Sequence, residues 1–344
     1  MKVVLQGIGG LLLAGLLLYW VLHDKDPQAL SAALWRASWG ALALAAVVNV
    51  AHNVFRVLRW RWLLDPVRAH VPFRPMFAAV ILGYMTTWLI PGRVGELVRP
   101  ALLSARENIP LGPTLGTVVA DRLLDGVAIV ALFAAGSLGA KFAAGGASLA
   151  AEVRVTAFVA LAVILIGLAV FVAISSLGGR LDGWLSRRAA PVRWAGNAAV
   201  GLSRGADALR SPRRVVPILV HSLLAWLTIG LGTWIGIRAA GADIGFSDVL
   251  VLLPMLALGV SLPTPGGVGG YHALMQLGLT SLFGVDPTIA AGAGILMHLS
   301  VVIPILILGP VLLYTEKISW GDLVAAGRQV KALGRGAQPL EAAR

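Results

Sequence analysis

Six long apolar stretches recur along the chain, and a stretch of about 20 apolar residues is enough to cross a lipid bilayer as a helix. Hydrophobic residues make up 58% of the sequence and charged residues only 13%, whereas soluble domains carry roughly 25% charged residues. The sequence therefore predicts an all-α polytopic membrane protein with about six full spans. The six stretches are residues 7–22, 40–64, 113–138, 153–177, 215–237 and 287–314.

Two further apolar stretches, residues 76–108 and 249–284, are interrupted near their midpoints. Pro91-Gly92 breaks the first, and the run Pro-Thr-Pro-Gly-Gly at 263–267 breaks the second. Each half is too short to cross a bilayer, and irregular backbone at membrane depth is tolerated where it is buried in protein or lines a cavity. We therefore predict two re-entrant helical hairpins, each of which enters and leaves on one side.

The net charge of +12 is concentrated in alternate loops, where most of the arginines lie. Positive loops face the cytoplasm, so both termini are expected there. The first hairpin then enters from the cytoplasm and the second from outside. The order span, span, hairpin, span occurs twice with opposite orientation, which predicts inverted repeats over residues 1–140 and 150–316, followed by a short basic cytoplasmic tail at 317–344.

Two basic segments are interpreted as parts of the chain that lie at the membrane surface. Residues 178–214 are rich in arginine and contain Trp184 and Trp194, a pattern typical of amphipathic helices on the cytoplasmic membrane surface. Nucleic-acid binding explains such a membrane-tethered loop less well, and no nucleic-acid partner is expected. A second basic and aromatic group ends the second apolar stretch and is interpreted as an interfacial anchor that sets topology. Its members are Arg56, Arg59, Trp60, Arg61 and Trp62.

Six charged residues lie in or beside apolar segments of the first half. Each costs about 2.5 to 3.5 kcal/mol at a helix centre, so they should pair or line a wet cavity. Asp121 and Asp125 are one helical turn apart and repel unless a cation sits between them. We expect Arg93 or Arg99 to insert against them and the cluster to be neutral. The six are Arg93, Glu96, Arg99, Asp121, Arg122 and Asp125.

This cluster allows two interpretations. In the first, it is only a buried ion-pair network that fastens the first hairpin to the next span. In the second, an anionic headgroup exchanges with the carboxylates for the arginines, whose planar fork suits phosphate. A helix beginning at Gly92 would add backbone donors and a positive dipole end at the same place.

The second hairpin tip is rich in glycine and could form a backbone N–H nest for an anion. The alternative is a tight turn with close helix packing. The tip residues concerned are Pro265, Gly266, Gly267 and Gly269. Tyr271 and His272 follow directly, and His298 lies in the last span; the two histidines could relay protons or simply join helices by hydrogen bonds. His52 and Asn53 are further polar residues inside an apolar segment, the second span.

The sequence contains little that indicates enzymatic or metal chemistry. The chain has no cysteine, which excludes disulfides, thiol nucleophiles and cysteine-ligated metals. We expect no cofactor and no metal.

Three motifs occur in order along the chain. They are Trp-Leu-Ile-Pro-Gly-Arg-Val-Gly-Glu-Leu-Val-Arg-Pro at 88–100, Asp-Arg-Leu-Leu-Asp at 121–125 and Pro-Gly-Gly-Val-Gly at 265–269. With them the chain resembles the lysylphosphatidylglycerol synthase transmembrane domain family, also called the flippase-like domain family, to about Trp320. The resemblance implies a protein of the bacterial inner membrane that moves a phospholipid or polyprenyl-linked lipid between leaflets.

Two departures from the family pattern matter. Fused members carry a soluble aminoacyl transferase domain after the membrane part, and here only a short tail follows, so no lipid aminoacylation is expected. Many relatives carry a glutamate where this chain has Tyr271-His272, which makes His272 the candidate substitute.

We therefore expect a lipid transporter that is not an enzyme, with the headgroup held between the two hairpins. Membrane lipids are the expected partners, and a lipid-modifying enzyme is a further candidate. The alternatives are an accessory subunit or membrane-embedded enzyme of lipid or glycolipid modification, and a pure scaffold.

Overall fold

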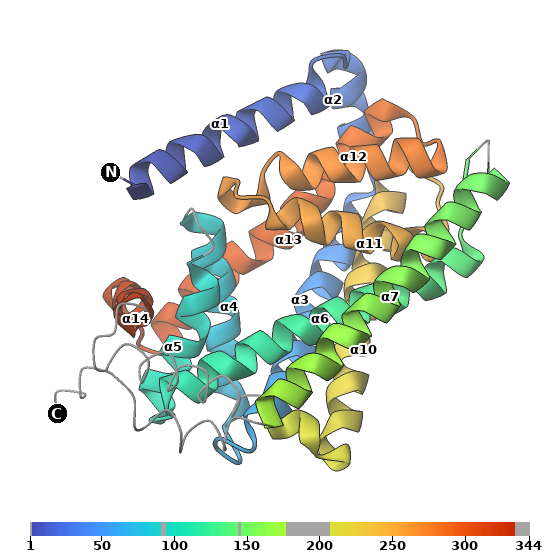
Figure 1. The fold of residues 1–344 in the computed structure, drawn as a ribbon. Coiled ribbons are helices and arrows are strands. Elements are labelled where there is room, and N and C mark those ends of the chain that lie inside the picture. Colours follow the sequence, from blue (N-terminus) through green and yellow to red (C-terminus); the bar gives the residue numbers. More distant parts are fainter. Residues whose placement is uncertain (1, 91–93, 144–145, 177–206, 334–344) are drawn as a thin grey trace.

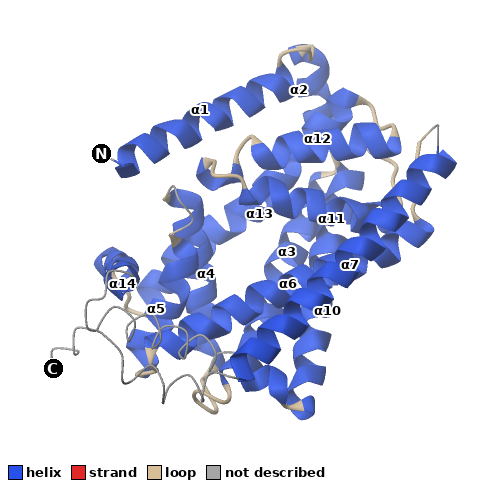
Figure 2. Cartoon of the chain, in the orientation of Figure 1, coloured by secondary structure: helices blue, strands red, loops and turns tan. Residues whose placement is uncertain are grey.

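The computed structural model of the chain describes residues 2–90, 94–143, 146–176 and 207–333 (Figure 1). Within these ranges the chain is built of helices and connecting loops, with no strand (Figure 2). The predicted all-α class is confirmed. The elements are α1 (Lys2–Leu22), α2 (Pro27–Arg36), α3 (Trp39–Leu64), α4 (Phe73–Leu89), α5 (Gly95–Glu107), α6 (Leu111–Gly139), α7 (Gly146–Ser176), η1 (Asp207–Arg210), α10 (Pro212–Ala239), α11 (Phe246–Ser261), η2 (Pro265–Gly267), α12 (Gly270–Phe283), α13 (Pro287–Thr315) and α14 (Trp320–Leu333).

Four of the described helices are long and apolar enough to cross a membrane: α3, α7, α10 and α13. Helix α7 is almost entirely unburied over its apolar length and presents Val155, Val163 and Ile166 outward. In water such a surface would aggregate, whereas in a bilayer it faces lipid tails. The chain is therefore a polytopic membrane protein.

The other two predicted spans, residues 7–22 and 113–138, are not straight apolar helices of the kind that crosses a membrane. Residues 7–22 of α1 and the whole of α2 form a pair bent by 90°, which is either one broken span or a re-entrant segment. Helix α6 has the length of a span, with 29 residues, but carries Asp121, Arg122 and Asp125 near its middle. Six full crossings remain a prediction for these two segments.

Both interrupted stretches form helix–turn–helix hairpins, as predicted. In the first, α4 packs against α5, and a Cβ added to Gly95 would overlap the carbonyl oxygen of Gly83. In the second, α11 packs against α12, and a Cβ on Gly270 would lie 2.5 Å from the carbonyl oxygen of Gly259. A glycine pair thus allows the two arms of each hairpin to approach closely.

The two halves of the chain pack in a corresponding way. Helices α3 and α10 lie against each other, and α3 contacts α4 as α10 contacts α11. Helix α6 packs on α11 of the second hairpin, where a Cβ on Gly136 would lie 2.6 Å from Cβ of Leu250. Helix α13 packs on α4 of the first hairpin, where a Cβ on Gly309 would overlap Met85. The first helices depart from this pattern, because α1 packs on α12 and α7 packs on α6.

The tip of the second hairpin lies against the end of α4. Gly266 and Gly267 of η2 adopt positive φ angles of 60° and 68° and lie against Trp88, near the end of α4. Helix α1 covers η2 from the other side, since a Cβ on Gly10 would lie 2.6 Å from the carbonyl oxygen of Pro263. The helices thus place the turn of the second hairpin next to the end of α4, an arm of the first hairpin.

The predicted basic tail is partly a folded element. Helix α14 packs on α5, where Gly327 faces Val94 and Val98. Just before α14, Glu316 forms ion pairs with Arg74 at the start of α4 and Arg106 near the end of α5. The base of the first hairpin is thereby tied to the end of α13. Most of the predicted amphipathic loop, residues 178–206, lies outside the described residues.

Candidate functional site

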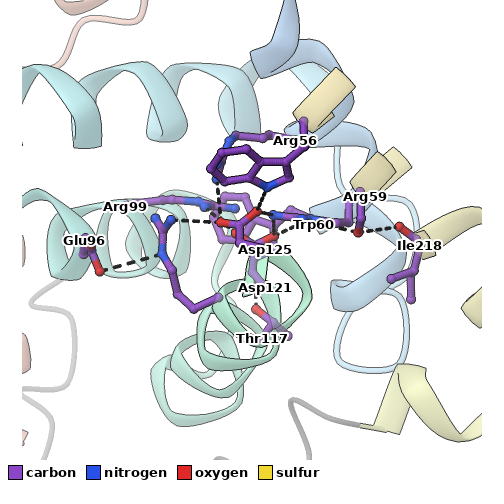
Figure 3. A network of polar contacts seen from close by, with 12 residues as sticks. Arg56, Arg59, Trp60, Glu96, Arg99, Thr117, Asp121, Asp125 and Ile218 are labelled. Atoms are coloured by element: carbon purple, nitrogen blue, oxygen red, sulfur yellow. Dashed lines mark hydrogen bonds and ion pairs between the residues drawn. The ribbon is translucent and has the colours of Figure 1, made fainter. Parts of the chain in front are cut away.

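Two aspartates of α6 form the centre of a buried charge cluster (Figure 3). Arg59 of α3 bridges them, with Nη2 lying 2.6 Å from Oδ1 of Asp121 and 2.9 Å from Oδ1 of Asp125. Its Nε donates to the same oxygen of Asp121 at 2.8 Å. The cation that the aspartate spacing requires is therefore present, but it comes from α3.

Asp125 collects three further donors. Nη1 of Arg56 lies 3.1 Å from its Oδ2, Nη1 of Arg122 lies 3.0 Å from the same oxygen, and Nε1 of Trp226 donates to Oδ1 at 2.9 Å. Arg122 also reaches Glu96, with Nε at 3.7 Å from Oε2. Glu96 and Arg122 are about one third exposed, so they form the open edge of the cluster, whereas Asp125 lies inside it.

Arg99 of α5 approaches from the hairpin. Its Nη1 donates to Oδ2 of Asp121 at 3.0 Å, which confirms the expectation that Arg99 inserts against the aspartates. Its guanidinium lies 3.9 Å from the ring centroid of Trp60, a cation–π geometry. The indole of Trp60 is held in turn by a 2.9 Å hydrogen bond to Thr117.

The interpretation of Arg56 and Arg59 as interfacial anchors is wrong. Both are buried, at 4% and 0% exposure, and both bind the aspartates. They were misread because they lie close to Arg61 and two tryptophans at a helix end, where cations usually reach toward the membrane surface. A signal was present, since Asn49, Asn53 and Arg56 recur at four- and three-residue spacing and share one face of α3.

The expected charge balance is also wrong. Four arginines face three carboxylates in the described part of the cluster, which leaves one positive charge in excess. Gly92 and Arg93 lie outside the described residues, so their expected place at the cluster remains a prediction.

A cavity of about 430 Å³ borders the cluster and extends to the second hairpin. Its wall includes Arg56, Arg99, Arg122, Glu96 and Asp125, but Asp121 and Arg59 lie behind that wall. Several arginine N–H donors have no hydrogen-bond partner among the described residues: Nε of Arg56, Nε and Nη2 of Arg99, and Nε of Arg122. The cavity therefore has a cationic end with unused donors.

Aromatic rings line the other end of the cavity. His298 of α13 lies 5.5 Å from Trp88 and 5.5 Å from Tyr271, measured between ring centroids, and all three line the cavity. His272 stacks on His298 at 4.8 Å but lies outside the lining. His52 and Asn53 line the cavity from α3. A proton relay through the two stacked histidines stays a prediction.

The glycines of the second tip serve the turn itself. The N–H groups of Gly267 and Val268 donate to Thr264 and Pro265, and that of Gly269 donates to Nδ1 of His272. Donors used in this way are not available to an anion, so the backbone-nest interpretation is wrong for these three groups. Gly269 has a φ of 84° and lies against α1, which accounts for its lack of a side chain. Of the four tip residues predicted to bind substrate, only Gly267 lines the cavity, and Pro265, Gly266 and Gly269 do not.

Fold and site together define a polytopic helical membrane protein with a charged internal cavity between two helical hairpins. The family described as lysylphosphatidylglycerol synthase TM region matches residues 7–309. The chain belongs to this family.

Two curated relatives add to this picture. Glycosyltransferase AglD of Haloferax volcanii is 28% identical over 327 residues, which cover 85% of this chain and 51% of AglD. The chain thus spans about half the length of that relative. UPF0104 membrane protein MJ1595 of Methanocaldococcus jannaschii is 30% identical over 84 residues, 24% of this chain and 25% of that protein.

Proposed function

We propose that this protein moves an anionic lipid between the two leaflets of a bacterial inner membrane and that it is not itself an enzyme. The headgroup phosphate would bind in the cavity at Arg56, Arg99 and Arg122. The observation that supports this most strongly is the set of buried guanidinium N–H donors without partners on one cavity wall. Buried donors are normally hydrogen-bonded, and arginine forks match phosphate oxygens in geometry and charge.

The carboxylates would hold the arginines while the cavity is empty of lipid. Asp125 binds Arg56 and Arg122 on the cavity wall, and Asp121 binds Arg99 from behind it. A phosphate entering past Glu96 and Arg122, the open edge of the cluster, could take over some of these donors. Because buried charge pairs are costly to separate without replacement, such an exchange keeps the arginines paired throughout.

The transport path would follow from inverted repeats over residues 1–140 and 150–316. The corresponding helix contacts and the glycine pair in each hairpin support this arrangement. In such transporters one repeat rocks against the other around a central site, so that the site opens to each side in turn. With both termini in the cytoplasm, the first hairpin would enter from the cytoplasm and the second from outside.

Reconstitution into vesicles tests this proposal. Fluorescent phosphatidylglycerol is placed in both leaflets, and an impermeant quencher is added outside. Vesicles with the protein should lose nearly all fluorescence, and protein-free vesicles about half. If only half is lost with protein present, for phosphatidylglycerol and also for a labelled polyprenyl phosphate, the proposal fails.

The name of the relative AglD, a glycosyltransferase, favours one second candidate, a membrane-embedded part of a glycolipid-modifying system. The same vesicles distinguish the two, because mass spectrometry of the lipids after incubation with nucleotide sugars would reveal a product of changed mass. A transporter leaves the lipid mass unchanged.

A further inference from the structure

The cavity has a second, uncharged polar region besides its arginines. Along one face of α3, Asn49 and Asn53 precede Arg56 and also line the cavity. At 1.5 Å rise per residue, the backbone of Asn49 lies about 10 Å from that of Arg56 along the helix axis. The cavity wall therefore changes from charged to neutral within the length of a small headgroup.

The neutral region holds polar atoms that have no partner. Most buried side-chain polar atoms lacking a hydrogen-bond partner within the described residues belong to residues of this cavity wall. Four of them are on uncharged side chains: Nδ2 of Asn49, Oδ1 of Asn53, Nε1 of Trp88 and Oγ1 of Thr264. Leaving such an atom unpaired usually costs about 1–3 kcal/mol, so a ligand that pairs them is favoured.

The mixture of these atoms indicates what kind of ligand would satisfy them. The amide nitrogen of Asn49 and the indole N–H of Trp88 donate, the amide oxygen of Asn53 accepts, and the hydroxyl of Thr264 does both. A phosphate would need donors alone. Hydroxyl groups both donate and accept, so a ligand with several hydroxyls fits this set.

The rings at this end suit a flat apolar face. Trp88, His298 and Tyr271 line the cavity and support one another, with interplanar angles of 74° and 71° about His298. His272 stacks behind His298. Aromatic side chains of this kind combine apolar surface with a polar edge, which is what a ring with C–H faces and hydroxylated edges requires.

We propose that the transported lipid carries a neutral hydroxylated ring, a sugar or cyclic polyol, beyond its phosphate. The phosphate would bind the arginines, and the ring would lie against Trp88 and His298 with a hydroxyl paired to Thr264. This inference rests on the proposed function and narrows its substrate class to phosphodiester lipids whose headgroup is a sugar or a cyclic polyol.

A matched lipid pair provides the test. Fluorescent phosphatidylglucose and phosphatidylcyclohexanol both carry one phosphodiester charge and a six-membered ring, and they differ in the ring hydroxyls. In vesicles with the full chain, phosphatidylglucose should exchange between leaflets about tenfold faster, the effect of one to three net hydrogen bonds. Trp88→Phe and Thr264→Val should each lower this rate ratio toward one. Trp62→Phe, at an exposed position of α3 outside the cavity wall, should leave the ratio unchanged.

Equal exchange of the two lipids by the unaltered protein would overturn this inference while leaving the proposed function in place. A tenfold ratio that survives both Trp88→Phe and Thr264→Val would overturn the assignment to this end of the cavity. If neither these lipids nor phosphatidylglycerol exchange, the proposed function itself fails. The ratio of the unaltered protein decides the inference even where a variant does not fold.

Discussion

The Nη2 atom of Arg59 lies 2.6 Å from Oδ1 of Asp121, and neither side chain has any solvent-exposed surface. This ion pair joins α3 to α6 at the centre of the charge cluster, behind the cavity wall. A pair in this position serves a different purpose from the arginines that line the cavity. It holds Asp121 in place, and Asp121 in turn holds Arg99.

Removing Arg59 should therefore destabilise the fold. Arg59→Met leaves two buried carboxylates short of a cation, and breaking a buried pair in this way costs about 3–5 kcal/mol. Thermal unfolding of the detergent-solubilised protein measures the loss. Arg61→Met, which changes an exposed neighbour on the same helix, is the control and should have little effect. Equal stability of the two variants would contradict a structural role for Arg59.

The glycine pairs in the hairpins should be intolerant of a side chain. Gly95→Ala places a methyl group onto the backbone of Gly83, and Gly270→Ala places one against Gly259. Each should lower stability by about 1–3 kcal/mol or more, because the arms must separate. Gly167→Ala on α7, where nothing lies within 4 Å, is the matched control and should be neutral or slightly stabilising. Folded protein yield and thermal stability are the measurements.

The link between Glu316 and the base of the first hairpin should restrain α5. Glu316→Gln weakens its ion pairs with Arg74 and Arg106 by about 1 kcal/mol or less, since both arginines are partly exposed. The effect should appear as faster labelling of a cysteine introduced as Ala101→Cys, a buried position on α5 in a chain without native cysteine. Arg238→Gln, which breaks an ion pair with Asp243 elsewhere, should not change the labelling rate.

The orientation can be tested in the same cysteine-free background. If the termini are cytoplasmic, Arg328→Cys on α14 should react with an impermeant thiol reagent only from the cytoplasmic side. Lys141→Cys, between α6 and α7, should react only from outside. Both positions are exposed, so accessibility depends on the side of the membrane alone. Reaction of both from the same side would rule out this topology.

Much of the fold could be predicted from apolar length and from breaks in it. Pro91-Gly92 and the run at 263–267 mark the two hairpins because proline next to glycine favours a turn, whereas single prolines such as Pro254 and Pro304 lie inside helices. The bend of 90° between α1 and α2 was missed, because apolar length does not report the angle between consecutive helices. The packing of α14 on α5 was missed because its basic residues gave no sign of a partner.

The site was predictable only in part. Asp121, Asp125 and Arg99 stand out because charge is rare in apolar segments, and the structure brings all three together. Arg56 and Arg59 lie near a helix end, where arginine is common for other reasons, and only the fold shows that these two side chains are buried. The unpartnered amides and the indole of Trp88 depend on contacts between distant helices, which no local pattern encodes.

Leaflet exchange by two variants tests the central claim most directly. Arg99→Gln removes a charged donor from the cavity wall, and Arg61→Gln removes an equal charge from an exposed position on α3. Both are reconstituted at equal amounts after folding is checked by thermal unfolding. If the cavity arginines hold the headgroup, Arg99→Gln should slow the exchange of phosphatidylglycerol at least tenfold, and Arg61→Gln should exchange it at the rate of the unaltered protein. Full-rate exchange by folded Arg99→Gln would contradict the account.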